Sequence, residues 1–250
     1  MDNILKIKNI SKNYFTDKEE IEAIRDITLD IRKGEFIAIV GPSGCGKSTL
    51  LNIIGGLDNK SSGEIIFTNN NCKIGYMFQQ DCLFDYLSIL DNCMLGLKIE
   101  KIDTKENRDR VIELLNNYGL ENFINSSPRN LSGGMKQRVA LIRTLATNPD
   151  ILLLDEPFSA LDYQTRLSVS DDVYKIIKKE NKTTIMITHD IAEAISMADR
   201  VVVLSKRPSV IKVIYNINLT DKSTPINNRT CKEFNKYYQT IWRSIEHNVS

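Results

Sequence analysis

A glycine-rich stretch at residues 41–49, with the sequence GPSGCGKST, constrains the fold more than any other part of the chain. The run GEFIAIV before it is apolar and has the length of a buried strand, whereas KSTLLNIIGGL after it has helical spacing of Leu50, Leu51, Ile54 and Leu57. The glycines let the backbone wrap around a concavity whose N–H groups point inward, toward which the following helix directs its positive dipole end. The pattern predicts strand, phosphate-binding turn and helix in an α/β fold.

Individual residues of this stretch have separate expected roles in binding a nucleotide. Lys47 would reach the β- and γ-phosphates, the Ser48 hydroxyl would ligate Mg²⁺, and Thr49 would support the phosphate cradle. The alternative is a glycine turn followed by Lys-Ser by chance, which the flanking strand and helix disfavour. The predicted ATP-binding residues of the loop are Gly41, Pro42, Ser43, Gly44, Cys45, Gly46, Lys47, Ser48 and Thr49.

A second landmark is PDILLLDEPFSALD at residues 149–162. Its aliphatic run predicts a central parallel strand that is covered on both faces. Ligands of open α/β sheets bind beyond the carboxyl ends of the strands, so Asp155 and Glu156 should face the glycine loop. Asp155 would then hold the Mg²⁺ shell through water, and Glu156 would polarise an attacking water as general base. The alternative, a pair of acids that merely ends a strand, loses weight beside a phosphate loop.

A third landmark is NLSGGMKQRVALIRTLA at residues 130–146, which predicts a helix with Ser132 as its N-cap. Gly133 and Gly134 each lower helix stability by about 1 kcal/mol relative to alanine. Two glycines are therefore expected here only if another group must approach the backbone closely. This second helix N-terminus has no lysine of its own. It therefore favours a surface that contacts the nucleotide of another subunit.

These stretches together resemble the ATP-binding subunits of ABC transporters. Over residues 4–205 the family's motifs stand in family order: GPSGCGKST is similar to Walker A, LSGGMKQR to the ABC signature, ILLLDE to Walker B and SALD to the D-loop. The resemblance implies that ATP lies between two subunits. It assigns the trans contacts to the signature residues Leu131, Ser132, Gly133, Gly134 and Met135, with a D-loop of Ser159, Ala160, Leu161 and Asp162.

Three further site residues follow from the resemblance. Gln79 matches the Q-loop glutamine that meets Mg²⁺ and the attacking water, His189 the switch histidine at the γ-phosphate, and Tyr14 the aromatic that stacks on adenine. Taken alone, each also fits an ordinary role: a solvated amide, a surface residue at a strand end and a sheet aromatic. The implied catalytic residues are Glu156, His189 and Gln79, and the implied metal ligands are Ser48, Gln79 and Asp155.

The expected organisation is an α/β fold, a P-loop NTPase core of the ABC ATPase type with a mixed sheet and a helical subdomain. Residues 1–79 and 148–205 would form the catalytic core. Residues 80–147 would form the helical subdomain with the signature, because NRDRVIELLNNYGL carries Val111, Leu114, Leu115 and Tyr118 at helical spacing. Residues 206–250 would be a C-terminal extension.

Composition excludes several classes of partner and site. A net charge of +1 provides no global basic field for nucleic acid. No apolar run approaches the roughly 20 residues of a membrane span, and the N-terminus lacks a signal-peptide core, which predicts a cytoplasmic protein. Five cysteines without a CxxC pair argue against disulfides or zinc.

One Walker A stretch without long heptads disfavours a soluble ABC ATPase of DNA repair, chromosome structure or translation. Lys47, Asp155, Glu156 and His189 disfavour a dead nucleotide site.

The resemblance also implies partners and cargo. A homodimer would bind ATP and Mg²⁺ on the cytoplasmic face of the membrane, energise transmembrane permease subunits and cooperate indirectly with a solute-binding protein. Residues 79–99 and LSKRPSVI are similar to importers of nitrate, sulfonate and taurine, although Asp85-Tyr86 replaces the group's frequent Pro-Trp. Importers of thiamine precursors are the alternative.

The apolar segment CLFDYLSIL has two interpretations. Its side chains either pack into the helical subdomain's own core or form a groove for a short helix of the membrane subunit, with Phe84 and Tyr86 as aromatic anchors. The segment's apolar residues are Leu83, Phe84, Tyr86, Leu87, Ile89 and Leu90.

Overall fold

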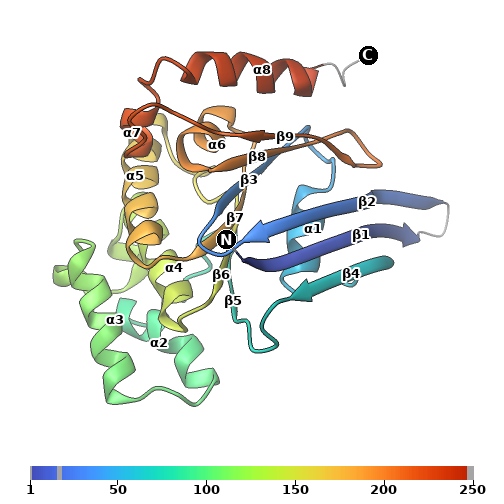
Figure 1. The fold of residues 1–250 in the computed structure, drawn as a ribbon. Helices are drawn as coiled ribbons and strands as arrows, with labels where there is room; N and C mark the ends of the chain where they lie inside the picture. The colour runs from blue at the N-terminus through green and yellow to red at the C-terminus, as the bar shows by residue number, and fades with distance from the viewer. Residues whose placement is uncertain (1, 16–18, 247–250) are drawn as a thin grey trace.

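Two sheets of different kinds form the body of the protein in a computed structural model that describes residues 2–15 and 19–246 (Figure 1). One sheet is antiparallel, with the order β2-β1-β4. The other has the order β5-β6-β7-β3-β8-β9, and in it only β9 runs antiparallel to its neighbour among the described strands. The strands are β1 (Asn3–Phe15), β2 (Glu20–Arg32), β3 (Phe36–Val40), β4 (Ser62–Phe67), β5 (Ile74–Met77), β6 (Ile151–Asp155), β7 (Thr183–Ile187), β8 (Arg200–Leu204) and β9 (Ile211–Asn216). The predicted mixed α/β fold is confirmed.

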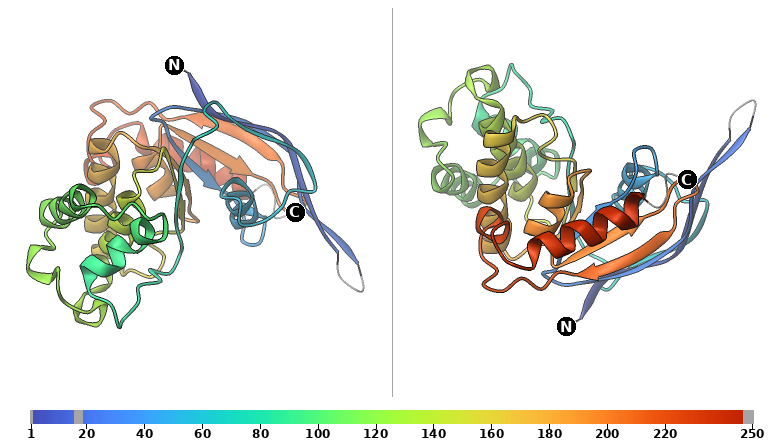
Figure 2. Two further views of the ribbon diagram at one scale, coloured as in Figure 1. Left: turned by 90° about the horizontal axis from the view of Figure 1, so that it is seen from below. Right: turned by 90° about the horizontal axis from the view of Figure 1, so that it is seen from above.

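The helices gather mainly on one side of the larger sheet (Figures 1 and 2). Several begin at a side-chain cap, as at Ser88, Thr104, Ser132 and Asp162, each of which accepts a hydrogen bond from the backbone N–H three residues later. The helices are α1 (Lys47–Ile54), α2 (Ile89–Ile99), α3 (Lys105–Asn117), α4 (Gly133–Ala146), α5 (Tyr163–Lys179), α6 (Ile191–Met197), α7 (Pro225–Asn228) and α8 (Phe234–Glu246), with 3₁₀ turns at Glu121–Phe123 and Pro128–Asn130.

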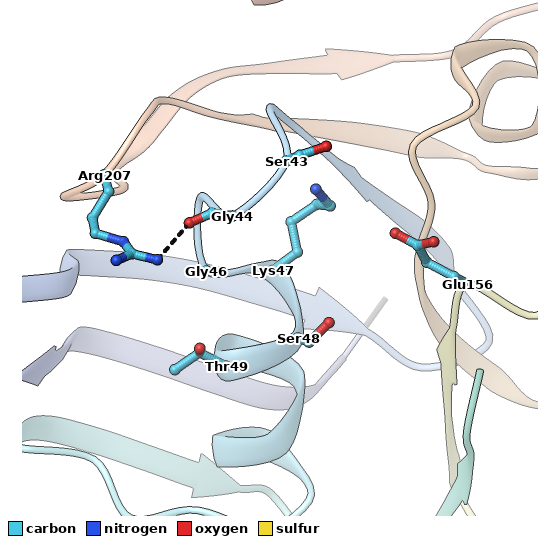
Figure 3. Close-up of a pocket in the computed structure, with 8 residues that line it drawn as sticks. All are labelled: Ser43, Gly44, Gly46, Lys47, Ser48, Thr49, Glu156 and Arg207. Carbon is cyan, nitrogen blue, oxygen red and sulfur yellow. Dashed lines mark hydrogen bonds between the residues drawn. The ribbon is translucent and has the colours of Figure 1, made fainter. Parts of the chain in front are cut away.

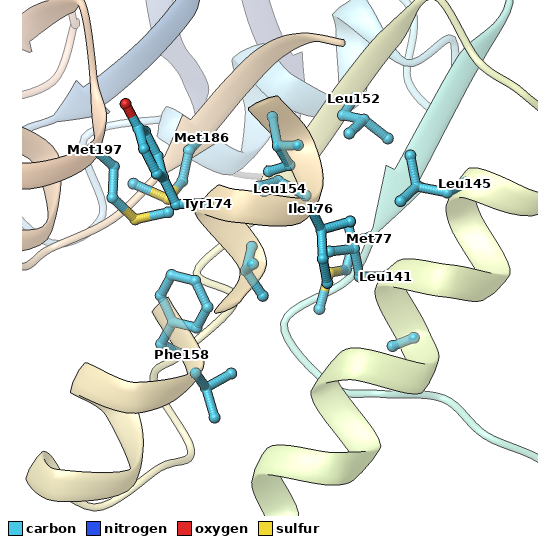
Figure 4. Packing of buried hydrophobic residues seen from close by; sticks show 14 of the residues in the cluster. Met77, Leu141, Leu145, Leu152, Leu154, Phe158, Tyr174, Ile176, Met186 and Met197 are labelled. Atoms are coloured by element: carbon cyan, nitrogen blue, oxygen red, sulfur yellow. The ribbon is translucent and has the colours of Figure 1, made fainter. Parts of the chain in front are cut away.

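Strand β3 stands at the centre of the larger sheet and divides two hydrophobic cores. Ile37 and Ile39 face a core shared with the antiparallel sheet and α1. Phe36 and its alternate neighbours face the core that the helices build, where Leu141 of α4 and Ile176 of α5 pack near Leu152 and Leu154 of β6 (Figure 4). A strand buried on both faces reads as a continuous apolar run, which explains why FIAIV and ILLL show no polar alternation.

The helix after the glycine loop is shorter than its apolar spacing suggests. It ends at Ile54, because Gly55 and Gly56 follow and Gly56 has a left-handed φ of 71°. Leu57 therefore lies beyond the helix and is exposed. Helix α3, in contrast, buries Val111, Leu114 and Leu115 as its spacing predicts.

The C-terminal part begins inside the larger sheet. Strand β9 pairs with β8 from Arg200↔Asn216 to Leu204↔Ile211, so residues 211–216 are a sheet edge and not an appendage. Helix α8 lies along this edge and buries Phe234 and Ile241 (Figure 2). We therefore propose a core of residues 1–79 and 148–216, a helical subdomain of residues 80–147, and an extension that starts after β9 and not at residue 206.

Candidate functional site

The glycine loop at residues 41–46 connects β3 to α1 and opens into a cavity of about 260 Å³. Gly44 and Gly46 have φ values of 71° and 109°, a region that favours glycine. Gly46 also caps α1, where a Cβ would lie 3.2 Å from the carbonyl oxygen of Ala23. The residues that line the cavity are Ser43, Gly44, Gly46, Lys47, Ser48, Thr49, Glu156 and Arg207 (Figure 3).

Lys47 is buried at the start of α1. Its Nζ donates to the carbonyl oxygens of Gly41 at 3.0 Å and Pro42 at 3.1 Å. An ammonium group has three donors, so these two bonds fix its position and leave one N–H free to turn toward the cavity. The loop therefore holds a positive charge where the sequence predicts the β- and γ-phosphates.

Ser48 and Asp155, which the sequence places 107 residues apart, come together at this cavity. The Ser48 hydroxyl donates to Oδ1 of Asp155 at 3.2 Å. Burial raises the pKa of the Asp155 carboxyl, the hydrogen bond from Ser48 lowers it, and the Glu156 carboxylate raises it further. Sequence reasoning misses Tyr76, whose hydroxyl lies 2.7 Å from Oδ1 of Asn52 and 3.4 Å from Oδ2 of Asp155. Only the pairing of β5 with β6 brings Tyr76 to this position.

Glu156 and His189 follow neighbouring parallel strands, β6 and β7. The Nδ1 atom of His189 lies 3.0 Å from Oε2 of Glu156. Glu156 has a left-handed φ of 45°, and its N–H donates to the Ile187 carbonyl at 3.0 Å. This backbone turn directs the carboxylate toward the cavity, where it faces Lys47 and Ser48 (Figure 3). The arrangement suits a carboxylate that accepts a proton from water.

Gln79 lies beside the D-loop. Its Nε2 donates to the Ser159 hydroxyl at 3.2 Å, and that hydroxyl donates to the Glu156 carbonyl at 3.1 Å. Among the hydrogen bonds of residues 2–15 and 19–246, none joins Gln79 to Ser48 or Asp155. The metal-ligand role of Gln79 therefore stays a prediction, while its contact to the loop after Glu156 is a property of the fold.

Tyr14 lies on β1 of the antiparallel sheet and is not among the lining residues of the cavity in the described part of the chain. Its hydroxyl donates to Oδ2 of Asp58 at 2.7 Å, and the Nζ of Lys12 lies 4.6 Å from its ring centroid. Lys12 also donates to Asp58 at 2.6 Å and thereby lowers the pKa of that carboxyl. The expected adenine-stacking ring is thus held in place by two residues that sequence reasoning does not single out.

The signature lies at the N-terminus of α4, outside the set of described residues that line the cavity. Ser132 caps the helix by accepting from the Met135 N–H at 3.3 Å, and both Ser132 and Gly133 are exposed. Leu131 and Gly134 are buried. The exposed edge of the motif is thus free to face a second molecule.

Gly134 has a structural reason that the sequence does not reveal. A Cβ at Gly134 would lie 2.7 Å from Cγ2 of Val169 on α5, whereas one at Gly133 would lie 3.1 Å from Cδ2 of Leu161 in the D-loop. Close packing of α4 on α5 within the chain therefore requires the second glycine. The D-loop continues into Asp162, which caps α5 by accepting from the Thr165 N–H at 3.1 Å, and Ala160 is exposed.

This contact predicts different stabilities for two neighbouring variants. Gly134→Ala should lower the free energy of unfolding by about 1–2 kcal/mol more than Gly133→Ala. The reason is that the stiff side chains of Val169 and Thr165 oppose a methyl group added at Gly134. Denaturant unfolding of both purified variants measures the difference. Equal stabilities would mean that α4 and α5 separate to accept the methyl without strain.

The described residues contain neither a membrane-spanning helix nor a cluster of metal-binding side chains. Within residues 2–15 and 19–246, no helix has the length and apolar character that crossing a bilayer requires. The same residues contain no group of three or more His, Cys, Asp or Glu side chains that could hold a metal ion. Cys45 and Cys93 are buried as free thiols, and Cys82 is exposed.

Comparisons with known proteins agree with this geometry. Residues 24–159 match the family described as ABC transporter. The nitrate import ATP-binding protein NrtD of Synechocystis is 41% identical over 95% of this chain and 93% of its own length. The aliphatic sulfonates import ATP-binding protein SsuB of Bacillus anthracis is 37% identical over 97% of this chain and 96% of its own length.

A solved structure has the same fold. The ATP-binding cassette MJ0796, described as a dimer in a post-hydrolysis state bound to ADP and Pi, superposes with a TM-score of 0.72 at 37% identity, and the match covers 86% of this chain and 99% of that one. The similarity in fold and the similarity in sequence thus point to the same family. The similar region includes the phosphate loop, the carboxylates at the end of β6 and the histidine that follows β7. The chain belongs to the ABC transporter family, as an ATP-binding subunit of the ABC ATPase type.

Proposed function

We propose that this protein hydrolyses ATP to energise an importer whose membrane-spanning subunits are separate chains. The observation that carries the proposal is the position of Glu156, which lines the same cavity as Lys47 and Ser48 and lies 3.0 Å from His189. A cation for the phosphates, a hydroxyl for the metal shell and a carboxylate for the attacking water then meet at one place. His189 would orient the γ-phosphate and the water with the help of Glu156.

Mg²⁺ is the proposed metal. Ser48 and Asp155 offer a hydroxyl and a carboxylate 3.2 Å apart, a donor set that fits a hard cation. Gln79 is the third predicted ligand, and the remaining positions would be filled by phosphate oxygens and water, as is usual for Mg²⁺ with nucleotides. When bound, the ion would neutralise charge that develops on the phosphates.

We infer a homodimer with two shared ATP sites. Ser132 and Gly133 are exposed on α4, and the similar cassette MJ0796 is described as dimeric. In the proposed dimer the loop at residues 41–49 of one subunit faces Leu131–Met135 of the other, and the D-loop residues 159–162 lie at the interface. The N-terminus of α4 would direct its backbone N–H groups at the γ-phosphate of the other subunit's ATP.

The proposed cargo is a small anion of the nitrate, sulfonate or taurine type. The support comes from import proteins for nitrate, aliphatic sulfonates and taurine that match most of the chain, among them the taurine import ATP-binding protein TauB of Pelagibacter ubique at 41% identity. Thiamine precursors are the second candidate. The subunit would bind permease subunits at the cytoplasmic face of the membrane, meet the solute-binding protein only through them, and bind no nucleic acid.

A membrane partner has a suitable surface beside Gln79. The apolar segment divides: Ile89 and Leu90 are buried in the helical core, whereas Phe84 is 40% and Tyr86 81% exposed, with ring centroids 5.5 Å apart. Its backbone is firmly held, because Arg143 of α4 donates to the carbonyl oxygens of Asp81 and Cys82, both at 2.6 Å. We propose that Phe84 and Tyr86 receive a short helix of the permease subunit.

Tyr86→Ala tests this surface. Because Tyr86 packs little against its own chain, the isolated subunit should keep its melting temperature and basal ATPase activity, whereas co-purification with the permease and transport should be lost. Ile89→Ala is the matched control, since truncation of a fully buried side chain should lower stability by about 2–5 kcal/mol. A large drop in the melting temperature of Tyr86→Ala would instead assign Tyr86 to the core.

Affinity purification of the tagged chain from its native cell, followed by identification of bound membrane and solute-binding proteins, tests the proposed function as a whole. Recovery of a permease whose transported solute stimulates ATP hydrolysis would support it. Recovery of DNA-repair or ribosomal partners without a permease would refute it.

A further inference from the structure

One cation in the phosphate cavity lies outside the motifs predicted to bind the nucleotide. Arg207 lies in the loop between β8 and β9, and its side chain is one of the cavity's lining residues (Figure 3). Its Nη2 donates to the Gly44 carbonyl oxygen at 2.9 Å. No carboxylate forms an ion pair with Arg207 in residues 2–15 and 19–246. A guanidinium that spends one donor on a neutral carbonyl keeps most of its five N–H groups available for an anion.

The loop that carries Arg207 is anchored on both sides. Within it, the Ser205 N–H donates to the Val210 carbonyl, and the Val210 N–H donates to the Ser205 hydroxyl, both at 3.0 Å. Ser209 is fully buried and exchanges backbone hydrogen bonds with β2, donating to Ala23 at 3.1 Å and accepting from Arg25 at 3.0 Å. Lys206 and Arg207 at the tip of the loop are exposed, as is Val210 at its end. Because the backbone of this loop is already held in place, binding of an anion by Arg207 should cost little additional conformational entropy.

The direction of approach decides which part of a nucleotide Arg207 would meet. Lys47 and Ser48 face Glu156, the side where the γ-phosphate and the attacking water are expected, whereas Arg207 reaches the loop from the opposite side (Figure 3). Its loop is bonded to β2, which pairs with β1, the strand that carries Tyr14. Arg207 thus lies on the side of the glycine loop away from Glu156, and its loop is joined through β2 to the strand that carries the expected adenine platform.

We propose that Arg207 is a nucleotide-binding residue that contacts the phosphate nearest the ribose, an assignment that rests on the ATP-binding function proposed above. The guanidinium would exchange its bond to the Gly44 carbonyl for charge-assisted bonds to the α-phosphate. Since ADP and ATP share that phosphate, the contact stabilises both complexes equally and does not act on the transferred group. Arg207 accordingly acts on the affinity for the nucleotide more than on the rate of the hydrolytic step.

Calorimetric titration of the full chain with Mg²⁺–ADP and with a non-hydrolysable ATP analogue tests the assignment. Arg207→Ala should weaken binding of both nucleotides about ten-fold, by equal factors, and Arg207→Lys should lose less because it keeps the charge without the planar fork. The matched control is Lys206→Ala, which removes the same charge from the same exposed turn and should stay within about two-fold of wild type. In steady-state hydrolysis, the KM for ATP of Arg207→Ala should rise by a larger factor than kcat falls.

A second readout separates a ligand from a tether of the loop. If Arg207 binds phosphate, Arg207→Ala should keep the melting temperature of the nucleotide-free protein and show a smaller rise on adding ADP. A lower melting temperature without nucleotide, together with an unchanged rise, would mean that Arg207 only braces Gly44. Unchanged affinities, or a loss confined to the ATP analogue, would also overturn the assignment. A wild-type protein that binds neither nucleotide would refute the proposed function itself, whereas the results just named refute only the role of Arg207.

Discussion

Replacing Glu156 by glutamine is expected to lower kcat for ATP hydrolysis by about 10²–10³-fold while ATP still binds. The amide has the size of the carboxylate but cannot take a proton from water. Lys47, Ser48 and Asp155 are untouched, so the phosphate and metal contacts remain. Phosphate release at saturating Mg²⁺–ATP measures the rate, and size-exclusion chromatography with ATP should show a persistent dimer.

A charge-matched control for this variant is Glu106→Gln, which removes an exposed carboxylate from the first turn of α3. Its turnover should equal that of the wild type. Undiminished hydrolysis by Glu156→Gln would exclude Glu156 as the general base and leave His189 as the nearest candidate.

The second large effect concerns the exposed edge of the signature. Ser132→Arg should abolish hydrolysis without weakening ATP binding to the monomer, because it adds bulk at an exposed position that would face the other subunit's ATP in the proposed dimer. Lys47→Ala should be inactive through loss of the phosphate contact. Equimolar mixing of the two inactive variants should restore about a quarter of the wild-type rate, since half of the dimers are mixed and each has one intact site.

Loss of the helix cap is controlled by Thr104→Arg, which removes the equivalent cap of α3. Both variants should lose about 1 kcal/mol of stability, but only Ser132→Arg should stop hydrolysis. If Ser132→Arg cannot bind ATP as a monomer, or if mixing restores nothing, the signature serves its own chain's nucleotide.

Parts of this site were predictable because they depend on local pattern and on sheet geometry. The glycine loop lies between an apolar run and a helix, and Asp155, Glu156 and His189 follow strands whose carboxyl ends meet at one edge. The order and direction of the strands determine these positions, whatever the details of side-chain packing. The resemblance to a family supplied the roles that no spacing could.

Other parts depend on pairings that no local window contains. Arg207 reaches Gly44 only because β8 lies beside β3, and Tyr76 reaches Asp155 only because β5 lies beside β6. The Asn- and Lys-rich composition of residues 206–250 gives no indication of strand β9, which forms only by pairing with β8. The packing of Gly134 against Val169 also depends on such an arrangement, that of α4 on α5.

The bonds from Arg143 to the loop at residues 81–82 give α4 a mechanical role. Arg143 stands near one end of the helix and Ser132 at the other, so about 16 Å of hydrogen-bonded backbone joins them. A helix of this length resists bending, and Gly134 seats it against α5. We therefore expect a displacement of Phe84 or Tyr86 by a bound partner to shift α4 as a rigid body. The signature at the other end of α4 should then move by a similar distance, because the helix itself deforms little.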